Sequence, residues 1–269
     1  MIRVLQGNLS RCILAQHLLR QRIFDGKVDI CIISEQHSNF QDGLWFADET
    51  GTAALSIANT KNITAINSGS GAGFVWIETP TAYFMSVYLS PNEGISVFRQ
   101  KLATIEDAIG KFNGGVIVAG DFNAKSAEWG AAFSDTRGNE VADAAARLDL
   151  IVLNTGNTTT FRGPGYQESV IDITLATPRI GNTIESWTVS EEYNGSDHQY
   201  VTFSVGLVPG SAPQCTLYKR KWNASKLDVD ALRTSFIRSI PTLQRNPSPS
   251  TRKETEEIVT RTMNIILDS

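Results

Sequence analysis

Short runs of apolar and β-branched residues recur along the first 205 positions of the chain and are separated by turn residues. Several runs, such as Val116–Ala119, are continuously apolar, which is typical of strands buried on both faces. Runs of this length and composition are typical of β-strands. The pattern predicts strands over residues 2–5, 28–33, 53–58, 74–77, 83–88, 116–119, 150–153, 171–175, 186–189 and 200–205.

Helical patterns separate some of these runs. Apolar residues from Ile95 to Phe112 recur at three- and four-residue steps, which predicts an amphipathic helix that ends at Asn113-Gly114-Gly115. Residues 11–24 and 139–148 show a similar but less regular pattern. A strand-rich core with a few covering helices indicates a layered α/β sandwich.

The composition changes near residue 205. Gly, Pro and Ser give residues 206–213 the character of a linker, and the basic run Lys219-Arg220-Lys221 follows. Two helical stretches are predicted further on, at about 225–240 and from Thr251, where an acid stands at capping-box spacing. We therefore predict a folded domain over residues 1–205, followed by a basic linker and helical connector over residues 206–269.

Composition and charge narrow the class of protein. The 269 residues carry a net charge of −4. Residues 1–205 hold 14 Lys and Arg against 22 Asp and Glu, a net charge of −8, and residues 206–269 have a net charge of +4. An acidic body binds phosphate backbones poorly unless bound metal or the basic tail offsets that field. The apolar runs are far shorter than the roughly 20 residues of a membrane span, and no secretory apolar segment opens the chain. Three cysteines without CxxC spacing favour a reducing compartment, so we expect a soluble intracellular protein.

Polar side chains stand at the ends of several predicted strands. Asp172 is the most informative, because an acid flanked by isoleucines needs a partner when it is buried. Loops at strand ends collect ligand groups because the sheet holds them rigidly. A carboxylate, amide or imidazole at several strand ends is what metal-assisted hydrolysis requires. The set consists of Asn8, Glu35, Tyr88, Asp121, Asn123, Asp172, Asp197 and His198.

Each of these residues also has an ordinary structural explanation. Asparagines such as Asn8 often stand in turns, and lone acids such as Glu35 are usually solvated. An isolated tyrosine such as Tyr88 would simply pack against neighbouring strands. For the whole set, such explanations require six coincidences at strand ends, and we therefore favour a functional site. His17, on a helical segment, and His37, in a polar loop, are assigned no role.

The polar residues stand in short motifs whose order along the chain is informative. They are Gly7-Asn8-Leu9, Ser34-Glu35-Gln36, Gly120-Asp121-Phe122-Asn123-Ala124, Ser169-Val170-Ile171-Asp172 and Ser196-Asp197-His198-Gln199. This series resembles the endonuclease/exonuclease/phosphatase superfamily, which includes apurinic endonucleases, pancreatic-type deoxyribonuclease and inositol-polyphosphate phosphatases. The order and the spread over residues 8–198 make the resemblance specific, whereas any one motif would be weak.

A second group of motifs narrows the resemblance. They are Lys125 through Trp129-Gly130, Asp135-Thr136-Arg137-Gly138, Val152-Leu153-Asn154-Thr155-Gly156 and Thr160-Phe161-Arg162. These resemble the N-terminal, apurinic-endonuclease-like endonuclease domain of LINE-type (non-LTR) retrotransposon polyproteins, particularly those of arthropods. The resemblance covers about residues 1–205, and the tail then resembles the connector toward a reverse transcriptase.

The resemblance implies a DNase-like, four-layered α/β sandwich, in which two packed, mainly antiparallel sheets are flanked by helices. It implies a DNA endonuclease that depends on Mg²⁺, with Mn²⁺ as a substitute, and leaves a 3′-hydroxyl that primes reverse transcription. The implied partners are double-stranded target DNA and the reverse transcriptase domain of a full-length polyprotein. The implied location is nuclear, and no membrane partner is expected.

Residue roles follow from the resemblance together with the chemistry of phosphodiester hydrolysis. The charge of the diester repels hydroxide, so catalysis needs cations and donors aimed at the non-bridging oxygens. Glu35 is the predicted main metal ligand, assisted by Asn8 and Asp197, since Mg²⁺ takes oxygen ligands and keeps several waters. Asp121 is the predicted general base, and Asn123 orients it or the attacking water if the loop is extended.

A dyad of Asp172 and His198 is predicted to stabilise charge on the phosphate. A buried carboxylate beside an imidazole favours the cation and fixes the ring. The hydroxyl of Tyr88 is predicted to donate to a phosphate oxygen. The predicted substrate-binding residues are Asn8, Tyr88, Asn123 and Thr160.

Three other functions stay open from the sequence. Two lie in the same superfamily: an apurinic-site repair endonuclease, and a phosphatase of small phosphoesters, which would need more basic residues around the motifs. The third is a catalytically silent nucleic-acid-binding domain, although such domains tend to lose the charged groups that this chain retains. The amino-acid sequence does not show which DNA target is recognised. The candidate reading loops, which would contact the target DNA and select its sequence, are Gln36–Thr52 and Thr155–Gln167. The basic 219–221 run is predicted to contribute to duplex binding.

Overall fold

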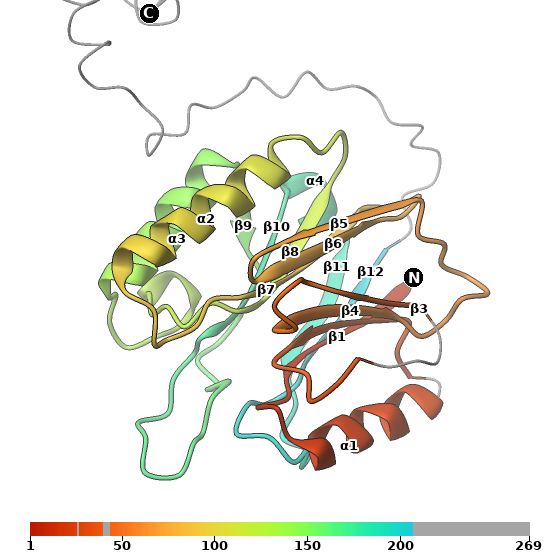
Figure 1. The fold of residues 1–269 in the computed structure, drawn as a ribbon, viewed down its shortest axis with the longest axis horizontal. Coiled ribbons are helices and arrows are strands. Elements are labelled where there is room, and N and C mark those ends of the chain that lie inside the picture. The colour runs from red at the N-terminus through yellow and green to blue at the C-terminus, as the bar shows by residue number, and fades with distance from the viewer. Residues whose placement is uncertain (26, 40–43, 207–269) are drawn as a thin grey trace, which may run out of the picture. The chain divides into compact units, whose positions relative to one another are not determined.

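The computed structural model describes residues 1–25, 27–39 and 44–206, which all lie in one compact unit (Figure 1). The helices predicted after Ser225 and the basic 219–221 run lie outside the described residues. Among the residues that are described, helices are too short or too polar for any of them to span a lipid bilayer.

Two six-stranded sheets form the centre of the fold. The first has the order β11-β12-β1-β2-β4-β3 and the second the order β5-β6-β7-β8-β10-β9. Each sheet contains one parallel pair, β1–β2 and β7–β8, and its other pairs are antiparallel. The strands are β1 Ile2–Asn8, β2 Ile30–Ser34, β3 Leu44–Ala47, β4 Ala53–Ile57, β5 Asn67–Gly71, β6 Phe74–Glu78, β7 Tyr83–Tyr88, β8 Val116–Asp121, β9 Ile151–Val152, β10 Asp172–Ala176, β11 Ile184–Val189 and β12 Val201–Val205.

Helices cover the outer face of each sheet (Figure 1). Helix α1 (Ile13–Phe24) packs on the first sheet through Ala15 and Leu19. Helices α2 (Ile95–Ile109) and α3 (Thr136–Arg147) cover the second sheet, and short α4 (Pro178–Gly181) and η1 (Ala127–Trp129) lie in connections. A third apolar cluster fills the space between the two sheets. The predicted four-layered α/β sandwich with mainly antiparallel sheets is confirmed.

The predicted strands are all present, with ends shifted by up to three residues, and two further strands were not predicted. The pattern of β5 is Asn-Ser-Gly-Ser-Gly, which carries no apolar signal, and the strand forms because it pairs with β6. The predicted helix over Ile95–Phe112 ends at Ile109, and the helix predicted over 139–148 begins three residues earlier. There Asp135 caps α3 by accepting a hydrogen bond from the amide of Gly138.

Strand direction brings the polar strand ends to one edge of the sandwich. In the parallel pair β1–β2, Asn8 stands opposite Ser34, directly before Glu35. In the parallel pair β7–β8, Tyr88 stands opposite Asp121. Strand β10 runs antiparallel to β8, so its first residue, Asp172, also pairs with Asp121. Segments far apart in the chain therefore meet where the strands of both sheets end.

Candidate active site

Asn8 and Glu35 form the part of the site that belongs to the first sheet. The buried amide of Asn8 donates to Asp121 Oδ2 over 2.9 Å and to Glu35 Oε2 over 3.3 Å. Glu35 is partly exposed, and its Oε1 lies 3.6 Å from the guanidinium of Arg11. Its φ of 49° places it in the left-handed region, which is unusual for a residue other than glycine. The local backbone thus turns sharply where the predicted metal ligand stands.

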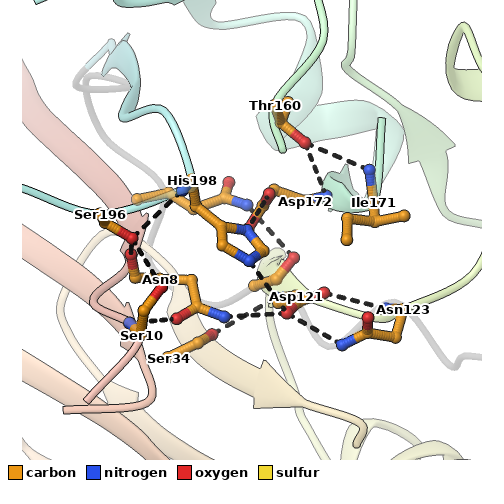
Figure 2. Close-up of polar contacts among 12 residues, drawn as sticks. Asn8, Ser10, Ser34, Asp121, Asn123, Thr160, Ile171, Asp172, Ser196 and His198 are labelled. Atoms are coloured by element: carbon orange, nitrogen blue, oxygen red, sulfur yellow. Dashed lines mark hydrogen bonds and ion pairs between the residues drawn. The ribbon is translucent and has the colours of Figure 1, made fainter. Parts of the chain in front are cut away.

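Asp121, at the end of β8, is held by Asn123 as well as by Asn8. Both its oxygens accept hydrogen bonds from Asn123, Oδ1 from the backbone amide over 3.0 Å and Oδ2 from the side-chain amide over 2.9 Å (Figure 2). Asn123 has a φ of 46°, so the loop is a tight left-handed turn. The loop is a turn and not extended, because the asparagine bonds the carboxylate two residues earlier. The turn still orients Asp121, as predicted for Asn123.

Asp172 and His198 form the predicted dyad. The Nδ1 atom of His198 lies 2.8 Å from Asp172 Oδ2, and its Nε2 lies 3.9 Å from Asp121 Oδ2. The three side chains are buried and lie close enough to share one small ligand (Figure 2). The other oxygen of Asp172, Oδ1, is buried and has no hydrogen-bond partner among the described residues. An orphaned carboxylate oxygen at this position calls for a ligand or a donor from a substrate.

The burial of these groups shifts their proton affinities. Burial raises the pKa of Asp121 to about 7, and the nearby charge of Asp172 acts in the same direction while that of His198 opposes it. Burial alone would lower the pKa of His198, but the charge and hydrogen bond of Asp172 raise it to about 9. Perturbed acids and bases in one cluster are typical of a catalytic site. His198 is therefore an imidazolium at neutral pH.

Tyr88 ends β7 on the side of the site that faces Glu35. Burial raises the pKa of its hydroxyl above the usual value, and the charge of Glu35 raises it further. The phenol therefore keeps its proton and can donate a hydrogen bond. The role of Tyr88 as a donor to a phosphate oxygen stays a prediction.

Two predicted residues lie differently from the expectation. The side chain of Thr160 is fully buried, and its hydroxyl accepts hydrogen bonds from the amides of Ile171 and Asp172 (Figure 2). It holds the backbone of Asp172, and the predicted contact with phosphate stays a prediction. Asp197 is exposed, and its backbone carbonyl accepts from the amide of Arg162. Its carboxylate is not part of the buried cluster of Asp121, Asp172 and His198.

The donor set fits a hard divalent cation. Carboxylate and amide oxygens are the ligands that Mg²⁺ takes, and one or two carboxylates suffice because the ion keeps several waters. Glu35 and Asn8 share a hydrogen bond, and Asn8 also contacts Asp121, so these oxygen-bearing groups are neighbours. The unpartnered oxygen of Asp172 adds a further acceptor nearby. Glu35 is the residue that could hold the ion directly, with Asp121 and Asp172 next to it, whereas the roles of Asn8 and Asp197 as further ligands stay predictions.

Several supporting residues were missed as functional residues, although the motifs contained some of them. Arg137 donates to the backbone carbonyls of the loop that follows Tyr88. Asn154 donates to the carbonyl of Asp172 and accepts from the amide of Thr174. Both stand in the motifs that narrowed the resemblance, so the signal was present in the sequence. What the sequence did not show was which backbone groups their side chains hold.

Comparisons with known proteins agree with this geometry. A family model described as endonuclease-reverse transcriptase matches residues 82–202, whereas a search of curated proteins finds no match. The endonuclease domain of TRAS1, a telomere-specific non-LTR retrotransposon, is 28% identical; the match covers 76% of this chain and 98% of that domain, with a TM-score of 0.65. A 3′ phosphatase, NExo from Neisseria, bound to a product DNA hairpin, is 13% identical, with 77% and 100% covered and a TM-score of 0.61. NExo from Neisseria meningitidis, described as a 3′-5′ exonuclease, is 14% identical, with 76% and 99% covered and a TM-score of 0.60.

The two neisserial structures share the fold with this chain, and the retrotransposon domain shares both fold and sequence. The chain therefore has the fold of a class of structures that includes nucleases and a phosphatase. Within that class it matches the endonuclease-reverse transcriptase family and is similar to a non-LTR retrotransposon endonuclease domain. The resemblance that was based on the motifs is confirmed.

Proposed function

We propose that this chain is a Mg²⁺-dependent DNA endonuclease that cuts one phosphodiester of a double-stranded target and leaves a 3′-hydroxyl for reverse transcription. The observation that carries the proposal is the buried cluster of Asp121, Asp172 and His198, which Asn8 connects to Glu35. A bound Mg²⁺ would supply positive charge to the phosphate oxygens. The similarity to an endonuclease-reverse transcriptase family supports DNA as the substrate, a polyprotein context and a nuclear location.

Asp121 is the base in this proposal. The oxygen of a water attacks phosphorus while Asp121 takes its proton. The bond from phosphorus to the 3′-oxygen breaks, its electron pair stays on that oxygen, and a second water protonates it, which leaves a 5′-phosphate and a 3′-hydroxyl. A carboxylate whose pKa is raised to about 7 accepts a proton more readily than an ordinary one. Asn123 and Asn8 fix the direction of its oxygens through their amide donors.

His198 and Tyr88 supply donors to the phosphate. The imidazolium of His198, oriented by Asp172, stabilises negative charge as it develops on a non-bridging oxygen. The protonated phenol of Tyr88 donates from the end of β7, next to Asp121. Preorganised donors of this kind cost little reorganisation during the reaction, which is why burial and fixed hydrogen bonds matter here.

The predicted reading loop Thr155–Gln167 lies beside the catalytic imidazole. The ring of Phe161 lies 4.9 Å from that of His198, and Tyr166 packs edge-on against Phe161 at 6.0 Å. Tyr166 is 74% exposed, so it presents an aromatic face to a bound duplex. We assign this loop to contacts with the DNA flanking the scissile phosphate.

The test is cleavage of supercoiled plasmid by the full chain in Mg²⁺, with and without EDTA, and with the cut ends mapped. We expect Mg²⁺-dependent nicks whose 3′ ends a polymerase extends directly. His198→Ala and Asp121→Ala should each abolish nicking, whereas Asp143→Asn, on the exposed face of α3, should not. Phosphate release from small esters without nicking would overturn the proposal, and a strong preference for abasic duplex would replace it with a repair function.

A further inference from the structure

Polar side chains cross between the two sheets directly beneath the site. The hydroxyl of Ser34, in β2 of the first sheet, donates to the carbonyl of Val87 over 3.1 Å. It also accepts from the amide of Asp121 over 3.3 Å (Figure 2). Both partners belong to the second sheet. Ser34 is almost completely buried and stands directly before Glu35.

Gln6 makes a second crossing from β1 of the first sheet. Its buried side-chain amide donates to the carbonyls of Gly120 and Ile173, over 3.3 Å each, and its oxygen accepts from the hydroxyl of Thr174 over 2.7 Å. Gly120 directly precedes Asp121, and Ile173 directly follows Asp172. Gln6 therefore holds the backbone on the inner side of both buried carboxylates.

The position of these crossings matters because the site is divided between the sheets. Asn8 and Glu35 come from the first sheet, whereas Tyr88, Asp121 and Asp172 come from the second. The core between the sheets is otherwise largely apolar, and apolar contacts are not directional. A hydrogen bond requires a set distance and angle, so it fixes the position of one sheet relative to the other.

We propose that Ser34 and Gln6 are positioning residues that set the spacing between the two halves of the site. Ser34 joins the backbone beside Glu35 to the amide of Asp121, and Gln6 ties the strand that carries Asn8 to both strands that carry the carboxylates. Both side chains are buried beneath the site. The inference rests on the proposed nuclease function for its kinetic consequences, but its structural consequence can be measured without activity.

Ser86 provides a matched control for Ser34. Its hydroxyl also crosses between the sheets, donating to the carbonyl of Ile33 over 2.7 Å, and its side chain is fully buried. The partners of this bond, Ser86 and Ile33, each stand one residue before the Val87 and Ser34 that form the other bond, farther from the strand ends. The bond of Ser86 does not involve Asp121. Loss of either hydroxyl leaves a buried backbone carbonyl short of a donor, so both alanine variants should lower the Tm to a similar extent.

The experiment compares Ser34→Ala and Ser86→Ala in the full chain, by nicking kinetics and by amide hydrogen exchange. We expect Ser34→Ala to lower kcat at least about 10-fold with KM little changed, since displacement of a catalytic group acts on the transition state. Ser86→Ala should keep most of the kcat. Exchange of the Asp121 amide should speed up in Ser34→Ala only. Gln6→Met should lower kcat as Ser34→Ala does, and Ser34→Thr, which keeps the hydroxyl, should recover part of the kcat.

A double variant separates positioning from a general loss of stability. If Ser34 acts through Asp121, Ser34→Ala should have no further effect on the residual rate of Asp121→Asn. Equal kcat in Ser34→Ala and Ser86→Ala, or equal exchange of the Asp121 amide in both, would overturn the proposal. Should the wild-type chain fail to nick DNA, the proposed function fails, and the exchange measurement alone still decides whether Ser34 holds Asp121.

Discussion

Asp172 Oδ2 lies 2.8 Å from His198 Nδ1, although 26 residues separate the two positions in the chain. The carboxylate fixes the ring so that Nε2 faces Asp121. Because both partners are buried, their interaction is weakly screened and decides the charge of the imidazole.

Asp172→Asn should lower kcat for nicking by about 100-fold or more, because it keeps the shape of the side chain and removes the charge. The pKa of His198, about 9 in the wild type, should fall, since burial then acts without the opposing carboxylate. The loss should therefore be larger at pH 8 than at pH 6, and a pH series of kcat/KM measures it. Asp143→Asn serves as the control, and a variant that keeps most of the wild-type rate would remove Asp172 from the mechanism.

Thr160→Val should destabilise the fold by about 1–3 kcal/mol, because the buried amides of Ile171 and Asp172 would lose their acceptor. Urea unfolding measures the change, and Thr104→Val, on the exposed side of α2, should change the free energy of unfolding by less than about 0.5 kcal/mol. The KM for DNA should stay near that of the wild type. An increased KM with unchanged stability would instead support the phosphate contact that the sequence suggested.

Asp29→Asn should lower stability in a pH-dependent way. Burial alone would raise the pKa of Asp29, but hydrogen bonds from Arg3 and Asn59 lower it from 3.8 to about 2. A group whose pKa is lower in the folded than in the unfolded state stabilises the fold at pH values above its unfolded pKa. That contribution is lost as the pH falls toward the folded pKa. Because Arg3 is 47% exposed, we expect a difference of only about 1 kcal/mol at pH 7.

This difference between wild type and Asp29→Asn should shrink as the pH falls from about 4 to about 2, as measured by urea unfolding across that range. Asp25→Asn, at the exposed end of α1, provides the comparison. A difference that stays constant with pH would show that the charge of Asp29 does not contribute to stability.

Tyr166→Ala should raise the KM for DNA about 5- to 100-fold and leave kcat nearly unchanged, since loss of one aromatic stacking contact costs about 1–3 kcal/mol. The fold should be unaffected because the side chain is largely exposed. Tyr193→Ala removes a similarly exposed tyrosine from the neighbouring 190–197 loop and should have less effect. Equal KM values for the two variants would argue against a specific contact by Tyr166.

The sequence by itself determined the residue types at the site and most of the elements. Polar residues that interrupt apolar runs, as Asp121 and Asp172 do, mark the strand ends directly in the order of residues. The regular spacing from Ile95 onward defined α2, and the ordered motifs indicated the superfamily and its sandwich. These features are local or repeat in a fixed order, so they can be read along the chain.

Only the tertiary structure decided which way the side chains point and what holds them. Thr160 points inward to the backbone of Asp172, and Asp197 lies at the surface, although both stand in motifs of the family. The β5 strand forms because β6 pairs with it, and Ser34 acquires its role because the opposite sheet lies against it. Such features depend on contacts between segments remote in the chain, whose packing no local pattern of hydrophobic and polar residues specifies.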